Sequence, residues 1–206
     1  PPVDIHVFKP LSKEAVHKTR QDFGWPLILS TGRLAAIKRW EWLIQMMPYI
    51  TKTFPSATLA VTGEISKENT SYVQKLMKIA HVLKVSKNIR FLGFQPLEKL
   101  VELYNAADVY VYPVPKEDFG LGPVEAMACG TPAVVWDDGA GPCETVISGK
   151  TGFRAEPYYI GDFAEKTMKA VDMDKDSMCD FSYNYVKENF SCEKHLQSLE
   201  KVLEKL

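Results

Sequence analysis

The stretch that decides the fold reads Glu117-Asp118-Phe119-Gly120-Leu121-Gly122-Pro123-Val124-Glu125-Ala126-Met127-Ala128-Cys129-Gly130-Thr131-Pro132. It predicts a loop that turns into a helix, because Gly120 and Gly122 permit positive φ angles and Pro123 suits a first helical position. The residues from Glu125 to Ala128 are good helix formers, and Gly130 is a typical helix end. Residues 133–136 then read as a buried strand.

A helix that begins in this way offers an anion site at its start. The N–H groups of Leu121, Gly122 and Val124 would point out of the helix N-terminus, where the macrodipole also favours negative charge. Glu117 in the loop and Glu125 in the helix lie eight positions apart, so they would flank a bound pyrophosphate and accept hydrogen bonds from sugar hydroxyls. By composition alone, the same stretch is also consistent with a tight connection that binds nothing.

The stretch resembles the E-x7-E motif of retaining glycosyltransferases with the GT-B fold, and it is most similar to family 4 (group 1). The resemblance rests on Glu117, Phe-Gly-Leu, a second Glu at position 125 and Ala-Met-Ala-Cys-Gly-Thr-Pro. Two further segments extend it: Gly32-Arg33-Leu34 followed by Lys38, and Thr145-Val146-Ile147-Ser148-Gly149-Lys150-Thr151-Gly152-Phe153. Altogether the resemblance covers residues 3 to about 194.

The resemblance implies a role for each residue of the motif. Arg33 and Lys38 would neutralise the donor diphosphate, and Glu117 would lie near the hydroxyls of the donor sugar as a positioning group, not a covalent nucleophile. Glu125 would accept hydrogen bonds from the ribose. The predicted catalytic residues are Glu117, Arg33 and Lys38. The other predicted donor-binding residues are Gly32, Phe91, Leu92, Gly93, Phe119, Gly120 and Leu121.

Each of these residues also has a simpler interpretation from its sequence alone. Arg33 and Lys38 are consistent with solvated charges beside a helix start, and Glu125 with an exposed helical glutamate. The nucleobase is expected near residues 91–94, but the two phenylalanines there fit a hydrophobic core equally well. Arg39 stands where the family usually has Gly, and Asp118 also replaces a Gly. Neither change removes a predicted contact.

Outside the motif, apolar periodicity predicts an α/β fold with strands and helices in alternation. The expected strands are 27–31, 58–61, 89–92, 109–111, 133–136 and 151–154. The expected helices include 12–22, one after Leu34 that Pro48 kinks or interrupts, 70–85, one through Leu97 and Tyr104, 160–172, 175–188 and 191–206. Ser191 is the expected N-cap of the last helix, whose apolar stripe is formed by Leu196, Leu199, Val202, Leu203 and Leu206. This order predicts a Rossmann-like doubly wound parallel sheet of about six strands with helices on both faces. Residues 1–206 are expected to form a single domain.

Charge and composition argue against several kinds of partner and cofactor. The chain has 25 basic and 26 acidic residues and a net charge of -1, so we expect no nucleic-acid partner. The four cysteines and four histidines show no metal-ligand spacing, and Asp108, Asp137 and Asp138 fit turns better than a metal site. We therefore expect no cofactor and metal-independent catalysis. We also expect a cytoplasmic protein, because no apolar run reaches the length of a membrane span.

The chain begins at Pro1 and not at Met, so we expect it to be an excised piece of a longer protein. The resemblance implies that it is the C-terminal half of a two-domain GT-B enzyme whose N-terminal acceptor domain is absent. By resemblance, the full enzyme would transfer a hexose from a donor such as GDP-mannose or UDP-glucose to a glycan or lipid-linked acceptor. Any membrane association would belong to the absent domain. The alternatives are a nucleotide-binding or interaction module without activity and a GT-B nucleotide-sugar epimerase. A dehydrogenase is disfavoured because no G-x-G-x-x-G follows the first strand.

Overall fold

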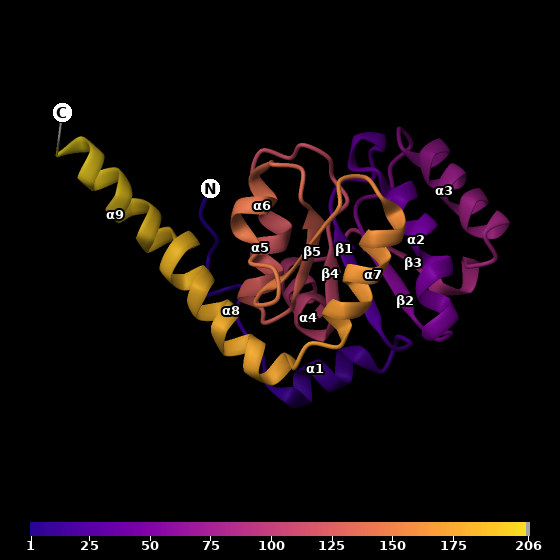
Figure 1. Ribbon diagram of the computed structural model, residues 1–206, viewed down its shortest axis with the longest axis horizontal. Helices are drawn as coiled ribbons and strands as arrows, with labels where there is room; N and C mark the ends of the chain where they lie inside the picture. Colours follow the sequence, from indigo (N-terminus) through magenta and orange to yellow (C-terminus); the bar gives the residue numbers. More distant parts are fainter. Residues whose placement is uncertain (205–206) are drawn as a thin grey trace.

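The structure is a computed structural model that describes residues 1–204, and its centre is a parallel six-stranded sheet (Figure 1). The strands are β1 (Leu27–Thr31), β2 (Thr58–Thr62), β3 (Ile89–Gly93), β4 (Val109–Val111), β5 (Ala133–Trp136) and β6 (Gly152–Ala155). Their order across the sheet is β3-β2-β1-β4-β5-β6, and every neighbouring pair is parallel. This order confirms the predicted doubly wound, Rossmann-like fold.

Helices cover both faces of the sheet. They are α1 (Lys13–Arg20), α2 (Trp40–Thr53), α3 (Thr70–Val82), α4 (Leu97–Ala106), α5 (Leu121–Ala128), α6 (Gly141–Thr145), α7 (Ile160–Val171), α8 (Lys175–Phe190) and α9 (Cys192–Leu203), with short 3₁₀ turns at Ala36–Lys38 and Ser86–Asn88. Helices α2, α3 and α7 pack on one face, and α1, α4, α5 and α8 on the other.

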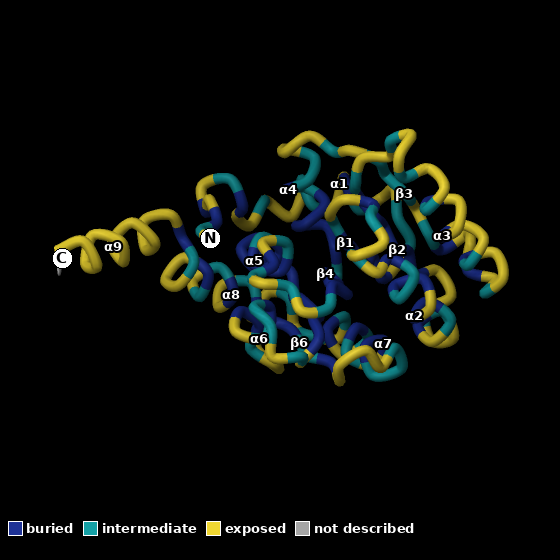
Figure 2. Tube along the Cα trace, turned by 90° about the horizontal axis from the view of Figure 1, so that it is seen from above, coloured by how far each residue is buried: buried dark blue, intermediate teal, exposed yellow. Residues whose placement is uncertain are grey.

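Strands β1, β2, β4 and β5 are buried because they send alternate side chains into two separate cores, whereas the edge strand β3 is only partly buried. In β1, Leu27 and Leu29 belong to the core under α4 and α5, whereas Ile28 belongs to the core under α2 and α7. This is the side-chain period of two that an extended chain imposes. Parallel sheets are normally buried on both faces, and the dark strands in Figure 2 show this burial.

The last helix behaves differently from the others. Ser191 caps α9 as predicted, since its hydroxyl accepts the Lys194 N–H at 3.2 Å. The helix then extends away from the body of the protein (Figure 1), and its apolar stripe is 47–67% exposed at Leu196, Leu199, Val202 and Leu203. Leu206, the last member of the predicted stripe, lies outside the described residues. No helix within residues 1–204 is long and apolar enough to cross a membrane.

The structure corrects two expectations about prolines, namely an interruption at Pro48 and the position of Pro123 in its helix. Pro48 does not interrupt its helix, because α2 runs from Trp40 to Thr53 with Pro48 inside it. Six side chains of α2 are buried, and this packing offsets the roughly 3 kcal/mol that an interior proline costs. Pro123 is the third residue of α5 and not the first, because the helix already begins at Leu121, after Gly120 at φ 77°.

Candidate functional site

The candidate site lies at the carboxyl ends of β1 and β4, where the strand order of the sheet reverses. Doubly wound sheets bind their ligands in the crevice outside this point. The segment after β1 carries Gly32, Arg33 and Lys38, and the segment after β4 carries Glu117 and the start of α5. Because β1 and β4 are neighbours, the fold brings together two segments that are about 80 residues apart in sequence.

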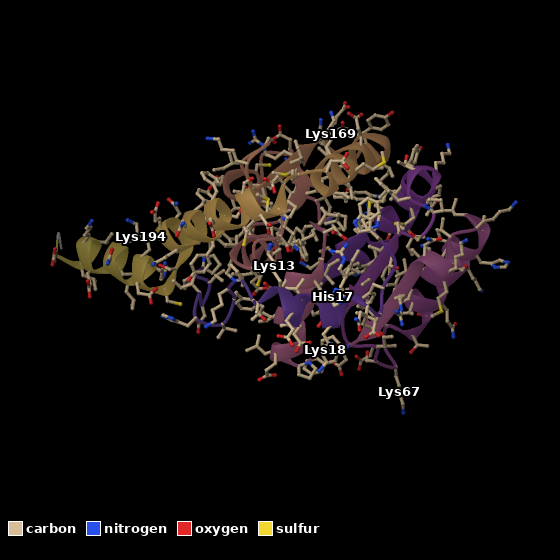
Figure 3. The ribbon with its side chains drawn as sticks, turned by 90° about the horizontal axis from the view of Figure 1, so that it is seen from below. Lys13, His17, Lys18, Lys67, Lys169 and Lys194 are labelled. Carbon is tan, nitrogen blue, oxygen red and sulfur yellow. The ribbon has the colours of Figure 1, made fainter. Side chains whose placement is uncertain are left out.

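Lys38 and Glu117 form an ion pair across this crevice. Lys38 Nζ lies 2.8 Å from Glu117 Oε2, and both side chains are largely buried. The Tyr112 hydroxyl closes a triangle, since it donates to the same Glu117 oxygen at 2.8 Å and accepts from Lys38 Nζ at 3.3 Å. Lys38 is thus turned into the protein, unlike Lys67, whose side chain extends away from the body in Figure 3. The structure thus brings together two of the predicted site residues, Lys38 and Glu117.

This triangle determines the ionisation of Glu117. Burial alone would raise the pKa of the Glu117 carboxyl, but hydrogen bonds from Lys38 and Tyr112 outweigh burial and hold that pKa below its usual range. Burial also raises the pKa of the Tyr112 phenol, which therefore stays protonated at neutral pH. The site holds an ionised carboxylate between two hydrogen-bond donors.

Glu125 is held by a second set of hydroxyl groups. The Tyr104 hydroxyl donates to Glu125 Oε2 at 2.8 Å, and Thr31 Oγ1 lies 2.9 Å from the Tyr104 hydroxyl and 3.0 Å from that of Tyr110. Burial raises the pKa of the Glu125 carboxyl, and the bond from Tyr104 offsets this only in part. Glu125 is therefore not the freely solvated helical glutamate of the simpler interpretation. Its second carboxylate oxygen has no partner among residues 1–204.

The loop after β1 places Arg33 differently from Lys38. The Arg33 side chain is exposed and lines a cavity of about 430 Å³ together with Glu64 and Asn69. Its guanidinium makes no hydrogen bond or ion pair to any residue that the structure describes. The loop itself is fixed, because Arg33 O accepts the Trp40 indole N–H at 3.0 Å. Arg33 therefore remains available to a ligand.

The glycines of this edge allow close approach of the backbone. Gly32 N donates to Thr62 O at 3.1 Å, and Gly63 N donates to Gly93 O at 2.9 Å, so the ends of β1, β2 and β3 are tied together. A Cβ on Gly63 would lie 2.2 Å from the carbonyl oxygen of Gly32. Only glycine fits at position 63 without moving this edge of the site.

The start of α5 supplies unpaired amides. The N–H groups of Phe119, Gly120 and Leu121 have no acceptor within the part of the chain that the structure describes, so they are available to an anion. The helix start was expected to free the amides of Leu121, Gly122 and Val124. Because α5 begins at Leu121, Val124 is its fourth residue and lies beyond the unpaired amides of a helix start. Gly120 is left-handed, and a Cβ on Gly122 would lie 2.2 Å from the Tyr110 hydroxyl. The Phe119 ring turns away from these amides and packs edge-on against Phe190, with ring centroids 6.0 Å apart.

The end of β3 has one exposed aromatic group. Phe91 and Leu92 are half-buried and pack against the two cores, which agrees with the core interpretation of these side chains. Gly93 has φ 69°, and Phe94, directly after it, is 74% exposed. Phe94 is thus the phenylalanine of this segment whose ring is free to contact a ligand.

Of the three aspartates considered for a metal site, Asp108 and Asp138 accept backbone N–H groups, and Asp137 lies 3.5 Å from the guanidinium of Arg154. Asp108 Oδ2 accepts from Leu27 N at 2.7 Å and pairs with Arg20 at 2.5 Å, which fixes the start of β1. Asp138 Oδ2 accepts from Lys116 N at 2.8 Å. Within residues 1–204, no three His, Cys, Asp or Glu side chains gather as metal ligands would.

Sequence reasoning missed the hydroxyl groups that hold the two glutamates, namely those of Thr31, Tyr104, Tyr110 and Tyr112. In sequence these residues look like ordinary members of buried strands and of an amphipathic helix. Thr31 and Tyr112 do carry a usable signal, because each stands at the carboxyl end of a predicted strand. The hydrogen bonds that these hydroxyl groups make depend on how neighbouring elements pack, which the sequence pattern alone does not reveal.

The fold is a Rossmann-like α/β domain with charged side chains and unpaired amides at one edge of its sheet, and comparison with known proteins gives its family. Residues 13–187 match the family described as "Glycosyl transferases group 1", and the chain belongs to this family. It is 32% identical to a D-inositol 3-phosphate glycosyltransferase of Corynebacterium jeikeium, over 100% of this chain and 51% of that protein. It is also 32% identical to the mannosylfructose-phosphate synthase of Agrobacterium fabrum, over 82% of this chain and 38% of that protein.

Solved structures agree with this fold. The C-terminal domain of a group 1 family glycosyl transferase (LpcC) from Francisella tularensis superposes with a TM-score of 0.79 at 25% identity, over 92% of this chain and 99% of that one. Anabaena HepE in complex with UDP superposes with a TM-score of 0.86 at 24% identity, over 100% of this chain and 56% of that one. The chain thus spans about half the length of HepE and of the Corynebacterium relative, and it has the fold of one GT-B half.

Proposed function

We propose that this chain is the nucleotide-sugar donor-binding domain of a retaining hexosyltransferase. The donor would be an NDP-sugar, with mannose or glucose as the favoured sugar, and the acceptor a glycan or a lipid-linked molecule. One observation carries the proposal: a lysine–glutamate pair, a partly buried glutamate and unpaired helix amides meet at the β1–β4 edge. The family match supports it, and so does HepE, a protein of the same fold that binds UDP.

Within this proposal, each group takes one part of the donor. Arg33, Lys38 and the amides at the start of α5 would hold the diphosphate and stabilise the charge that develops on it as the sugar leaves. The free oxygen of Glu125 would accept a hydrogen bond from a ribose hydroxyl. Glu117, kept ionised by its two donors, would accept from the sugar hydroxyls. The exposed ring of Phe94 lies beside the expected position of the base.

No metal is required in this scheme, because cationic side chains and backbone amides supply the positive charge next to the diphosphate. The acceptor would be held by a further N-terminal half of the same protein, and the relatives, which are about twice as long as this chain, support that division. We therefore expect the 206-residue chain to bind the donor without sustained transfer. We also propose a cytoplasmic location, since the four free thiols suit a reducing compartment.

The proposal is tested by titrating the chain with UDP, GDP, ADP and their sugar conjugates in the presence of EDTA, followed by calorimetry. We expect one nucleotide to bind clearly, and Arg33→Ala or Glu125→Ala to weaken it about tenfold, since each removes a charged hydrogen-bond partner. Lys87→Ala, which removes an exposed lysine in the turn before β3, at the opposite edge of the sheet, serves as the control and should change nothing. Absence of binding by any nucleotide to a folded sample, or full affinity in Glu125→Ala, would contradict the proposal.

A further inference from the structure

Tyr112 contacts both members of the Lys38–Glu117 pair and is itself held firmly. Its side chain is only 7% exposed, and its ring stacks on Tyr110 with a centroid distance of 6.4 Å and an interplanar angle of 21°. On its other side the ring lies against Gly120, where an added Cβ would be 3.2 Å from a ring carbon. The hydroxyl group therefore has a fixed position between the two charges.

The triangle is complete without a ligand, so a diphosphate must compete for Lys38. Phosphate oxygens near the start of α5 would draw the Lys38 ammonium from Glu117, since a lysine serves as a mobile point charge on a flexible stem. Glu117 would then lose its ion-pair partner while its side chain is only 24% exposed. A carboxylate in that situation either takes up a proton or turns towards solvent unless another donor keeps it.

We propose that Tyr112 is a positioning residue for the donor sugar. Its hydroxyl keeps Glu117 ionised and directed into the crevice after Lys38 has moved to the diphosphate. Lys38 thus binds the phosphates, and the Tyr112 hydroxyl remains hydrogen-bonded to Glu117, so the two functions do not interfere. The inference rests on the proposed function and adds to it a residue that decides how well the site distinguishes a sugar nucleotide from the bare nucleotide.

The test compares bare and sugar-bearing nucleotides in Tyr112→Phe, which keeps the ring and removes only the hydroxyl. Calorimetry with UDP and UDP-glucose, and in parallel with GDP and GDP-mannose, gives the preference for the sugar nucleotide as a ratio of two Kd values. In Tyr112→Phe we expect the bare nucleotide to bind within about twofold of wild type, and the sugar nucleotide to bind about tenfold more weakly, as for loss of a hydrogen bond to a charge. In a Glu117→Gln background, Tyr112→Phe should add less than about twofold, because Tyr112 acts through Glu117.

Lys38→Met provides a test that leaves Tyr112 in place. It should weaken bare and sugar-bearing nucleotides alike and leave the ratio between them unchanged, since Tyr112 alone then holds Glu117. Tyr49→Phe, an exposed tyrosine on α2, controls for the type of substitution. If Tyr112→Phe weakened both ligands equally, Tyr112 would have a structural role only. The inference would also be overturned if Tyr112→Phe kept the wild-type preference for the sugar nucleotide, or if wild type showed no such preference. If wild type binds no nucleotide at all, the proposed function itself fails.

Discussion

Replacing Gly122 with alanine tests whether the start of α5 is fixed by its contact with Tyr110. A Cβ on Gly122 would lie 2.2 Å from the Tyr110 hydroxyl oxygen and 3.0 Å from ring carbon Cζ, closer than atoms can approach. The Tyr110 ring is fully buried, and its hydroxyl lies 3.0 Å from Thr31 Oγ1. The ring cannot move aside without losing that bond and disturbing the core around it, so α5 itself must shift.

The expected magnitude follows from two opposing effects. Overpacking a filled core costs about 1–3 kcal/mol, whereas alanine is better than glycine inside a helix by up to about 1 kcal/mol. We therefore expect Gly122→Ala to lower the free energy of unfolding by about 1–2 kcal/mol. In a chain of this size each kcal/mol corresponds to about 2–4 °C, so the melting temperature should fall by about 2–8 °C. Scanning calorimetry and urea unfolding measure both quantities.

Gly161→Ala in α7 is the matched control. A Cβ there would meet only ring atoms of Tyr159, at 3.0–3.1 Å, and Tyr159 is 58% exposed, so it can turn into solvent. This variant should be as stable as wild type or up to about 1 kcal/mol more stable, because it gains helix propensity without overpacking. If Gly122→Ala were as stable as Gly161→Ala, the close contact between α5 and Tyr110 would be refuted.

Three further predictions concern separate features. Lys84 ends α3 in a left-handed conformation (φ 58°) within a Schellman arrangement that favours glycine, so Lys84→Gly should raise the unfolding free energy by about 1 kcal/mol in urea titrations; a loss of stability would contradict this. The pKa of Glu117 is lowered in the folded state. The ionised carboxylate therefore stabilises the folded protein above the ordinary pKa of 4.5, and this stabilisation is lost as pH falls through the folded pKa. Lys38→Met should therefore cost about 1–2 kcal/mol at neutral pH and less in acid, as denaturant unfolding at several pH values would show, and a cost independent of pH would argue against the ion pair. Burial raises the pKa of the Cys129 thiol, so a disulfide-exchange reagent should label exposed Cys192 at least tenfold faster than Cys129 in the native protein, and equal rates would contradict the burial of Cys129.

The sheet could be predicted from sequence because its strands are short apolar runs with clear ends. The predicted bounds of β1, β4 and β5 are those of the structure, and the errors elsewhere are of one residue at β2, β3 and β6. The runs of β1, β2, β4 and β5 are buried on both faces, so local composition and tertiary environment agree there. Pro48 shows where such reasoning fails: the rule about proline is local, whereas the burial of α2 that overrides it is tertiary.

The candidate site was predictable only in part, for a related reason. Lys38, Glu117 and Glu125 stand in recognisable motifs, and the structure gives each of them a hydrogen-bonded position at one edge. The hydroxyl groups of Tyr104 and Tyr112 that hold these glutamates belong to no motif, because their role arises from packing between elements. Periodicity likewise predicted the stripe on α9 but could not show that the described residues leave it uncovered.

The most direct test of the donor site is to map nucleotide binding onto the backbone amides of this chain by NMR. With the nucleotide that binds best in calorimetry, and EDTA present, the account predicts the largest shifts at Gly32 and Gly120–Gly122, around the carboxyl ends of β1 and β4. Gly24 and Asp108, at the opposite edge of the sheet, should remain unchanged. Shifts that gather at that opposite edge, or on α9, would contradict the assignment of this crevice as the donor site.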